Sequence, residues 1–227
     1  MSLERAPCRL FVYLAREAPV GVVLRRGPSD WVRLSVWHTD TDSVEHGQWM
    51  KGRVYERRSD VSADGSLFVA FVRQSGGRPG ERPSTDYIAY IDGSPEWTDR
   101  TVHFNRLLRD GWQRIENETH RTKWERRHPA DERTLVMVQR FESFGTHGGP
   151  YVVDYAIREG SQGAECALGR ATWADWDHSG RLVLARDGRL LVSTGPQSSA
   201  IIEDFNDQEP DPAAAPASAR LWPTPPR

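Results

Sequence analysis

Residues 60–71 read Asp-Val-Ser-Ala-Asp-Gly-Ser-Leu-Phe-Val-Ala-Phe, a polar turn that closes on Gly65 and is followed at once by an apolar run. Glycine adopts positive φ without steric cost, and Asp and Ser bond their own backbone in turns, so the first half predicts a tight turn. Leucine, phenylalanine and valine suit a pleated, half-buried surface, so the second half predicts a strand. The pattern returns at 175–183 as Asp-Trp-Asp-His-Ser-Gly-Arg-Leu-Val.

The two copies form a repeat, because four of their residues match at constant spacing: Asp60 with Asp175, Gly65 with Gly180, Leu67 with Leu182, and Ala70 with Ala185. Leu34 and Leu135 lie about one step of 33 residues before Leu67 and about two steps of 34 after it. A turn-and-strand unit cannot bury its apolar face alone, so recurrence predicts units that stack side by side. We count four visible units and infer a fifth between Leu67 and Leu135.

The strand pattern predicts an all-β fold, in the form of a β-propeller-like array of about five short blades. The alternative is a two-sheet β-sandwich. In a propeller, residues 9–14 would close the ring by pairing with residues 200–205. Further strands are predicted at 20–25, 31–37, 43–49, 87–91, 134–141, 151–157, 180–185 and 189–193, with a loop at 74–86 and one short helix at 119–127.

One domain is predicted over residues 1–206. Residues 207–227 are rich in Pro and Ala, cannot bury enough apolar surface to offset their ordering entropy, and are expected to form a mobile tail in which Trp222 is the one large aromatic.

Composition argues against several classes of function. The formal net charge is −2 over 227 residues, which gives no overall bias toward nucleic acid or membranes. Cys8 and Cys166 are the only cysteines and are expected to be reduced thiols of a cytoplasmic protein. No apolar run has the length of a membrane span. The seven histidines show no zinc spacing, and no cofactor motif is present, so we expect neither metal nor cofactor.

The segment from Lys51 to Arg58 is the candidate binding site. Basic and aromatic side chains interleave there, which suits an anion or a nucleic-acid backbone: Trp49, Lys51, Arg53, Tyr55, Arg57 and Arg58. On a strand, Arg53, Tyr55 and Arg57 would share one face and place two guanidiniums around one ring. The alternative is structural, with the arginines paired internally to carboxylates such as Glu56 and Asp60.

The hypothesis of an enzyme rests on carboxylates. A glycosidase-like hydrolase needs two carboxyl groups about 5–10 Å apart in an open pocket. The carboxylates nominated for this role are Glu56, Asp60, Asp64, Asp175 and Asp177. The competing interpretation makes Asp60, Gly65, Asp175 and Gly180 structural turn residues. We therefore expect a binding domain for a protein or anionic ligand, with hydrolysis as the alternative.

Several motifs resemble a family of uncharacterised bacterial proteins. They are Arg25-Arg-Gly-Pro-Ser-Asp-Trp31, the run from Gly47 to Asp60, Ser62-x-Asp-Gly65, Trp173 to Leu182, and Asp204-Phe-Asn206. The resemblance covers the first 75 residues or so and the last 55 or so before the tail. It implies a shared fold and contributes no catalytic residue.

Overall fold

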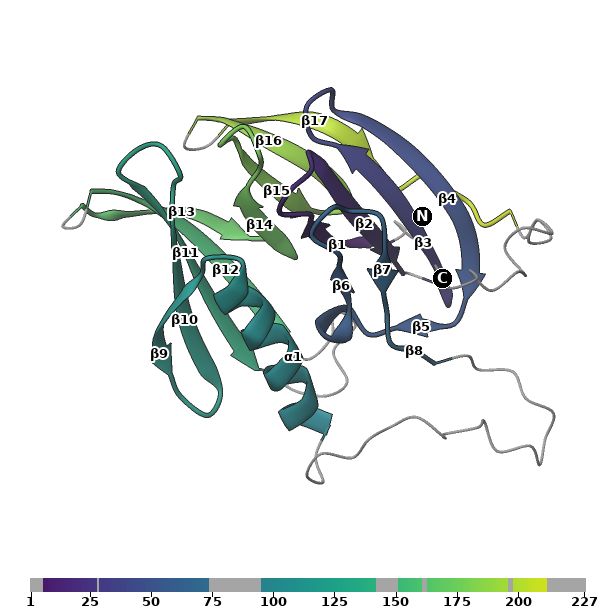
Figure 1. Ribbon diagram of the computed structural model, residues 1–227, viewed down its shortest axis with the longest axis horizontal. Helices are drawn as coiled ribbons and strands as arrows, with labels where there is room; N and C mark the ends of the chain where they lie inside the picture. The colour runs from purple at the N-terminus through teal and green to yellow at the C-terminus, as the bar shows by residue number, and fades with distance from the viewer. Residues whose placement is uncertain are drawn as a thin grey trace, which may run out of the picture.

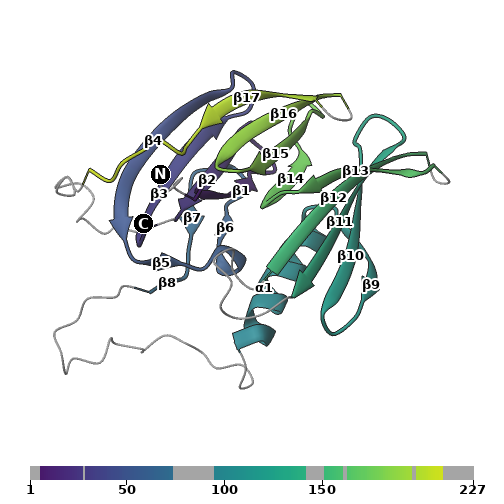
Figure 2. The ribbon, with the colours of Figure 1, turned by 180° about the vertical axis from the view of Figure 1, so that it is seen from behind.

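The computed structural model describes residues 6–27, 29–73, 95–141, 151–160, 163–195 and 198–211. These residues form an all-β fold of antiparallel sheets with one α-helix (Figures 1 and 2). The predicted loop at 74–86 and the predicted strand at 87–91 lie outside the described residues, as does Trp222.

Three sheets are simple meanders in which each strand pairs with the next. The first sheet contains β1 (Arg9–Leu14), β2 (Val20–Arg26), β3 (Trp31–His38) and β4 (Ser43–Lys51). The second contains β9 (Gln113–Asn117), β10 (Arg121–Arg127), β11 (Arg133–Phe141), β12 (Tyr151–Glu159) and β13 (Glu165–Arg170). The third contains β14 (Trp173–Trp176), β15 (Leu182–Arg186), β16 (Arg189–Gly195) and β17 (Ser198–Asp204).

Two short strand pairs, which we call the small hairpins, follow the first sheet. β5 (Arg53–Val54) pairs with β8 (Val72–Arg73), and β6 (Asp60–Val61) pairs with β7 (Phe68–Val69). A single 3-10 turn, η1 (Glu56–Arg58), separates β5 from β6, and the helix α1 (Pro95–Arg109) precedes the second sheet.

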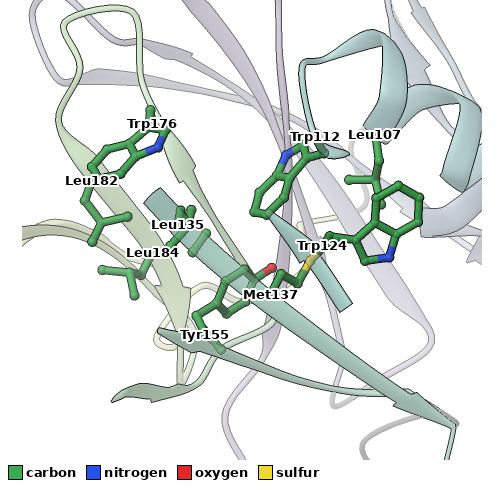
Figure 3. Packing of buried hydrophobic residues seen from close by; sticks show 11 residues of the cluster. Leu107, Trp112, Trp124, Leu135, Met137, Tyr155, Trp176, Leu182 and Leu184 are labelled. Carbon is green, nitrogen blue, oxygen red and sulfur yellow. The ribbon is translucent and has the colours of Figure 1, made fainter. Parts of the chain in front are cut away.

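The sheets stack in an order set by their alternating side chains. On β1, Leu10 and Val12 pack with Val183 and Ala185 of the third sheet, whereas Tyr13 points the other way, toward Val61 and the small hairpins. The third sheet buries its other face against the second sheet and α1, where Trp124, Leu135 and Trp176 form the largest apolar cluster (Figure 3). The order is therefore small hairpins, first sheet, third sheet, second sheet.

The helix α1 joins the two ends of this stack. Figure 1 shows it between the second sheet and the small hairpins, and it contacts both β9 and η1. The Arg106 guanidinium donates to the Ser59 carbonyl oxygen at 2.6 Å, and Arg109 forms an ion pair with Asp60 of β6. Side chains rather than strand pairs thus complete the circle of layers.

The structure confirms the repeated turn. Gly65 and Gly180 have φ of 78° and 75°, the left-handed region that glycine adopts without strain. In both copies the glycine N–H donates to the carbonyl three residues back, at 3.1 Å to Ser62 and 2.9 Å to Asp177. In both copies the turn joins the first two strands of a unit, β6 to β7 and β14 to β15.

The prediction that Leu34 and Leu135 mark further copies of this unit is wrong. Leu34 and Leu135 lie on β3 and β11, the third strands of their sheets, whereas Leu67 and Leu182 follow the repeated turn. The fifth unit inferred between Leu67 and Leu135 includes the helix α1.

The predicted ring closure by strand pairing is also absent from the described residues. β1 pairs only with β2, and β17 pairs only with β16, so no blade is shared and no closed propeller forms. The first and third sheets instead pack face to face around Trp37, Val183 and Phe205, which fits the sandwich alternative.

The helix predicted at 119–127 is wrong, because this segment is β10. Thr122 and Trp124 are buried while Arg121 and Lys123 are half-exposed, a period of two that suits a strand between β9 and β11. The helix lies earlier in the chain, where His103, Phe104 and Leu107 form one inward face of α1.

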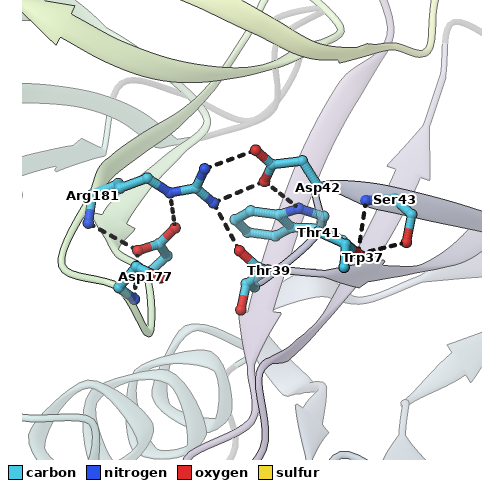
Figure 4. Close-up of polar contacts among 8 residues, drawn as sticks. Trp37, Thr39, Thr41, Asp42, Ser43, Asp177 and Arg181 are labelled. Carbon is cyan, nitrogen blue, oxygen red and sulfur yellow. Dashed lines mark hydrogen bonds and ion pairs between the residues drawn. The ribbon is translucent and has the colours of Figure 1, made fainter.

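An arginine interlocks the first and third sheets through their turns (Figure 4). Arg181 donates to both carboxylate oxygens of Asp42, at 2.7 and 2.8 Å, and to the Thr39 carbonyl oxygen at 2.8 Å. Its Nε donates to Asp177 at 2.7 Å. The repeated turn of the third sheet is therefore fixed to the β3–β4 turn of the first.

The start of the predicted tail is in contact with the domain. The backbone carbonyl oxygen of Gln208 accepts a hydrogen bond from Arg25, which is only 1% exposed. The side-chain oxygen of Gln208 accepts a hydrogen bond from Arg33. Residues 212–227 lie outside the described residues.

Candidate functional site

The layers and α1 surround a cavity of about 1330 Å³. Its lining comes from β1, η1, α1, β12 and β14, so every layer of the stack contributes. Both copies of the repeat place their aspartate here, Asp60 from β6 and Asp175 from β14. The cavity is the feature around which the sheets are arranged.

One side of the cavity is a buried polar chain that links the small hairpins, the second sheet and α1. Arg57 of η1 donates to the Gln139 side-chain oxygen at 3.2 Å, and the Gln139 amide nitrogen lies 2.9 Å from Nε2 of His103. Nδ1 of His103 lies 3.2 Å from the guanidinium of Arg106. Burial, followed by the charges of Arg57 and Arg106, holds the pKa of His103 well below its usual value.

This row of buried polar side chains contains more hydrogen-bond donors than acceptors. A neutral imidazole has one acceptor nitrogen, yet His103 lies between the Arg106 guanidinium and the Gln139 amide nitrogen, which both donate. Turning the Gln139 amide over moves the same conflict to its contact with Arg57.

The two repeated aspartates make the same pair of interactions. Asp60 Oδ1 accepts from the N–H of Val61 and Asp175 Oδ1 accepts from the N–H of Trp176, each at 2.8 Å. Each carboxylate also forms an ion pair with an arginine, Arg109 for Asp60 and Arg126 for Asp175.

The two aspartates differ in burial. Asp175 is 6% exposed and also accepts from the Trp112 indole N–H at 3.3 Å. Burial raises the pKa of Asp175, and Arg126 opposes that rise. Its role is therefore to tie β14 to β10 and to the segment after α1, rather than to cap the turn as predicted.

Arginine dominates the charge of the lining. The cavity is lined by eleven arginines and seven carboxylates, in a chain whose formal net charge is −2. Within the described residues, several of these guanidiniums form no ion pair: Arg16, Arg53, Arg127, Arg170 and Arg186. The cavity is thus a local concentration of positive charge in a protein that has none overall.

The predicted basic segment does not form one surface. β5 ends at Val54 and η1 follows, so Arg53, Tyr55 and Arg57 do not share a strand face. Two guanidiniums do lie over the Tyr55 ring, those of Arg53 at 4.8 Å and Arg58 at 5.2 Å. Arg57 is instead buried, with its guanidinium 3.5 Å from the centre of the Tyr151 ring.

Of the six predicted binding residues, Arg53 and Arg57 line the cavity. Trp49 lies on β4, where its ring is covered by the guanidiniums of Arg25 at 4.9 Å and Arg33 at 5.3 Å. Lys51 is exposed at the end of β4.

The nominated carboxylates separate into two groups. Asp64 lies in the exposed repeated turn, where Ser62 and Ser66 donate to it and lower its pKa to about 2. The other four line the cavity, and each is bound by an arginine: Glu56 by Arg26, Asp60 by Arg109, Asp175 by Arg126, and Asp177 by Arg181.

Most of the residues that line the cavity were not predicted from the sequence. They include Arg9 and Arg26 at facing ends of β1 and β2, and His103, Arg106 and Gln139 from distant elements. The sequence held a signal only for Arg9 and Arg26, because an arginine at the end of an apolar strand is expected at the edge of the core. Nothing local relates His103 to Gln139.

The described residues contain no group of three His, Cys, Asp or Glu side chains arranged to hold a metal ion. Nor does any helix in that part of the chain have the length and apolar character needed to cross a membrane. Comparisons with protein-family models, with curated proteins and with solved structures found no match.

Proposed function

We propose that this chain is a binding domain that takes a small anionic molecule into the central cavity and performs no chemistry on it. The observation that carries the proposal is the excess of arginine over carboxylate in the lining of an otherwise acidic protein. Arginine forms planar, bidentate contacts with carboxylates and phosphates and stays charged when partly desolvated, which suits this task.

The state of the carboxylates favours binding over hydrolysis. A glycosidase needs one carboxyl group that is protonated and free to give up its proton. Glu56, Asp60 and Asp177 are each held in an ion pair with a guanidinium, so none of them has a carboxyl group free of protein partners. Asp175 is buried but accepts three hydrogen bonds.

The architecture supports the same proposal. The repeated aspartates both line the cavity, and side chains of α1, not strand pairs, connect the two ends of the stack of sheets. A rigid wall of sheets gives a preformed site, which lowers the entropic cost of binding a small molecule.

Tryptophan fluorescence tests the proposal directly, because Trp112, Trp173 and Trp176 all line the cavity. Small anions of increasing charge, such as acetate, citrate, inorganic phosphate and pyrophosphate, would be titrated beside neutral glycerol and cationic spermidine. We expect saturable changes with anions alone.

The variant Trp112→Phe locates the signal, since it removes one cavity fluorophore and keeps an aromatic ring. We expect it to reduce the ligand-induced change. A protein that responds to no anion, or equally to spermidine, would refute the proposed function.

A further inference from the structure

Two arginines face each other directly across the first strand pair. Arg9 of β1 is the register partner of Arg26 of β2, and both line the cavity. Side chains that are directly opposite in an antiparallel pair lie on the same face, with Cβ atoms about 5 Å apart, and like charges there are destabilising. Two guanidinium side chains therefore leave the same face of the first sheet at the cavity wall.

A third arginine and one carboxylate join this pair. Glu56 of η1 binds Arg26 at 2.6 Å, with both side chains less than 20% exposed. Arg53 of β5 also lines the cavity. Burial lowers the pKa of Arg9, the charges of Arg26 and Arg53 lower it further, and Glu56 raises it. Arg9, Arg26 and Arg53, which we call the arginine triad, all line the cavity, and the charges of Arg26 and Arg53 both act on Arg9.

Another facing pair of arginines on the same sheet shows what a structural role looks like. Arg25 and Arg33 are register partners on β2 and β3, but both stack on the Trp49 ring. Arg25 also donates to the carbonyl oxygens of Phe205 and Gly27. That pair points away from the cavity and is committed to holding β4 and the C-terminal segment.

We propose that the arginine triad binds the phosphate group of the ligand that the cavity takes, an organic phosphate of small-molecule size. The inference rests on the proposed function. A phosphate dianion offers several oxygens to several guanidiniums at once, whereas a carboxylate offers two oxygens and a single charge. The triad carries three positive charges against the one negative charge of Glu56, so a bound phosphate brings the charge of this group closer to neutral.

The position of the triad favours a small molecule over a nucleic acid. The triad lines the same cavity as His103 and the repeated aspartates, with Arg9 and Arg26 half-buried and Arg53 exposed. Backbone-binding proteins present their basic residues on an open groove instead.

The test is a calorimetric titration with inorganic phosphate and pyrophosphate, with citrate as the carboxylate probe and a single-stranded oligonucleotide as the nucleic-acid probe. Four proteins are compared: the parent, Arg9→Gln/Arg53→Gln, Arg127→Gln and Glu56→Gln. Arg127 is the matched control, because it lines the cavity, is exposed, and makes no ion pair within the described residues.

We expect phosphate to bind the parent, and the double variant to bind it about tenfold to a hundredfold more weakly, as for the loss of charged hydrogen bonds. Arg127→Gln should stay within about threefold of the parent, because Arg127 lies at the end of β10 and, unlike Arg53, does not act on Arg9. Glu56→Gln should bind phosphate more tightly, since it removes the one carboxylate in the group. Tighter phosphate binding by Glu56→Gln cannot be a result of partial unfolding. It therefore still tests the role of the triad if the double variant is less stable than the parent.

The outcomes separate the two proposals. Binding of citrate without phosphate, equal loss in Arg127→Gln and the double variant, or weaker binding in Glu56→Gln would each overturn the role of the triad and leave the anion cavity standing. Preference for a single-stranded oligonucleotide over pyrophosphate would also overturn it. If no anion binds at all, the proposed function fails first.

Discussion

Arg181 and Asp42 form a bidentate ion pair between the turns of two different sheets, with N–O distances of 2.7 and 2.8 Å. The same guanidinium also binds Asp177, whose side chain is fully buried. Arg181 is therefore the shared partner of one half-exposed and one buried carboxylate.

Arg181→Ala should lower the free energy of unfolding by about 2 kcal/mol, because it leaves the buried Asp177 without its guanidinium partner. Arg181→Lys keeps the positive charge but cannot make the bidentate contact of a guanidinium, so it should lower the free energy of unfolding by about half as much. Urea unfolding at pH 7 measures both. An Arg181→Lys protein as stable as the parent would mean that charge alone matters.

The same pair predicts a dependence on pH. Hydrogen bonds from Arg181 lower the pKa of Asp42, so this contribution is fully present above the unfolded aspartate pKa of about 3.9. It is lost as the pH falls through the lower folded pKa. The stability difference between the parent and Arg181→Ala should therefore shrink between pH 4 and pH 2, and a constant difference would contradict the pairing.

Gly180→Ala and Gly65→Ala should each destabilise by about 1 kcal/mol or more, because both positions have positive φ. Gly180→Ala should cost more, since a Cβ there would lie 2.9 Å from Nε2 of His128, against 3.3 Å from the side chains of Ala15 and Val20 at Gly65. Gly169→Ala is the control for backbone strain alone, with φ of 83° and open space. Thermal unfolding of the three variants gives the order.

The repeated aspartates provide a matched test of burial. Asp175→Asn should destabilise by about 3 kcal/mol, because Asp175 is buried and holds Arg126 and Trp112. Asp60→Asn should cost about 1 kcal/mol, since Asp60 and Arg109 are each about one-third exposed. If urea unfolding gave equal losses of unfolding free energy for the two variants, burial would not determine what each aspartate contributes to stability.

Acid should destabilise the fold through His103. Its folded pKa is well below the unfolded value of about 6.5, so the unfolded state takes up the proton first. Stability should fall as the pH drops below 6.5, by at most about 1.4 kcal/mol per pH unit from this residue. His103→Gln removes the titration, and its stability should change less between pH 7 and pH 5.5. An unchanged slope would place the titrating group elsewhere.

Truncation should reveal the contacts of Gln208. A chain that ends at Asn206 should melt below one that ends at Asp211, because Arg25 and Arg33 each lose an acceptor. The cost is about 1–3 kcal/mol for a buried charged donor. Identical melting temperatures would assign no stability to this segment.

The sequence predicted what depends on neighbours in the chain. Gly65 and Gly180 were identified because turn geometry is local, and β1 was placed at 9–14 because its apolar run is clear. The strand β10 was taken for a helix because Thr119 before it suits a helix cap and Pro129 after it suits a helix stop. Its pairing with β9 and β11 cannot be deduced from its own residues.

The site was less predictable than the fold, because it is made by stacking. The basic segment contributed Arg53 and Arg57, but the residues that face them come from β1, β2, α1 and β11. The period of about 34 residues suggested equivalent units, yet only two of the four marker leucines follow the same turn. Charge counted over the whole chain concealed the arginine-rich lining.

The contact between α1 and η1 makes one boundary of the molecule different from all the others. Elsewhere adjacent layers share broad apolar faces, whereas here Arg106, Arg109 and Arg57 make the connection through polar side chains. Regions with few apolar contacts open at lower free energy than the core does, so we expect this boundary to open before the others. A ligand that spans the cavity should then slow amide exchange in α1 while leaving β14 to β17 nearly unchanged.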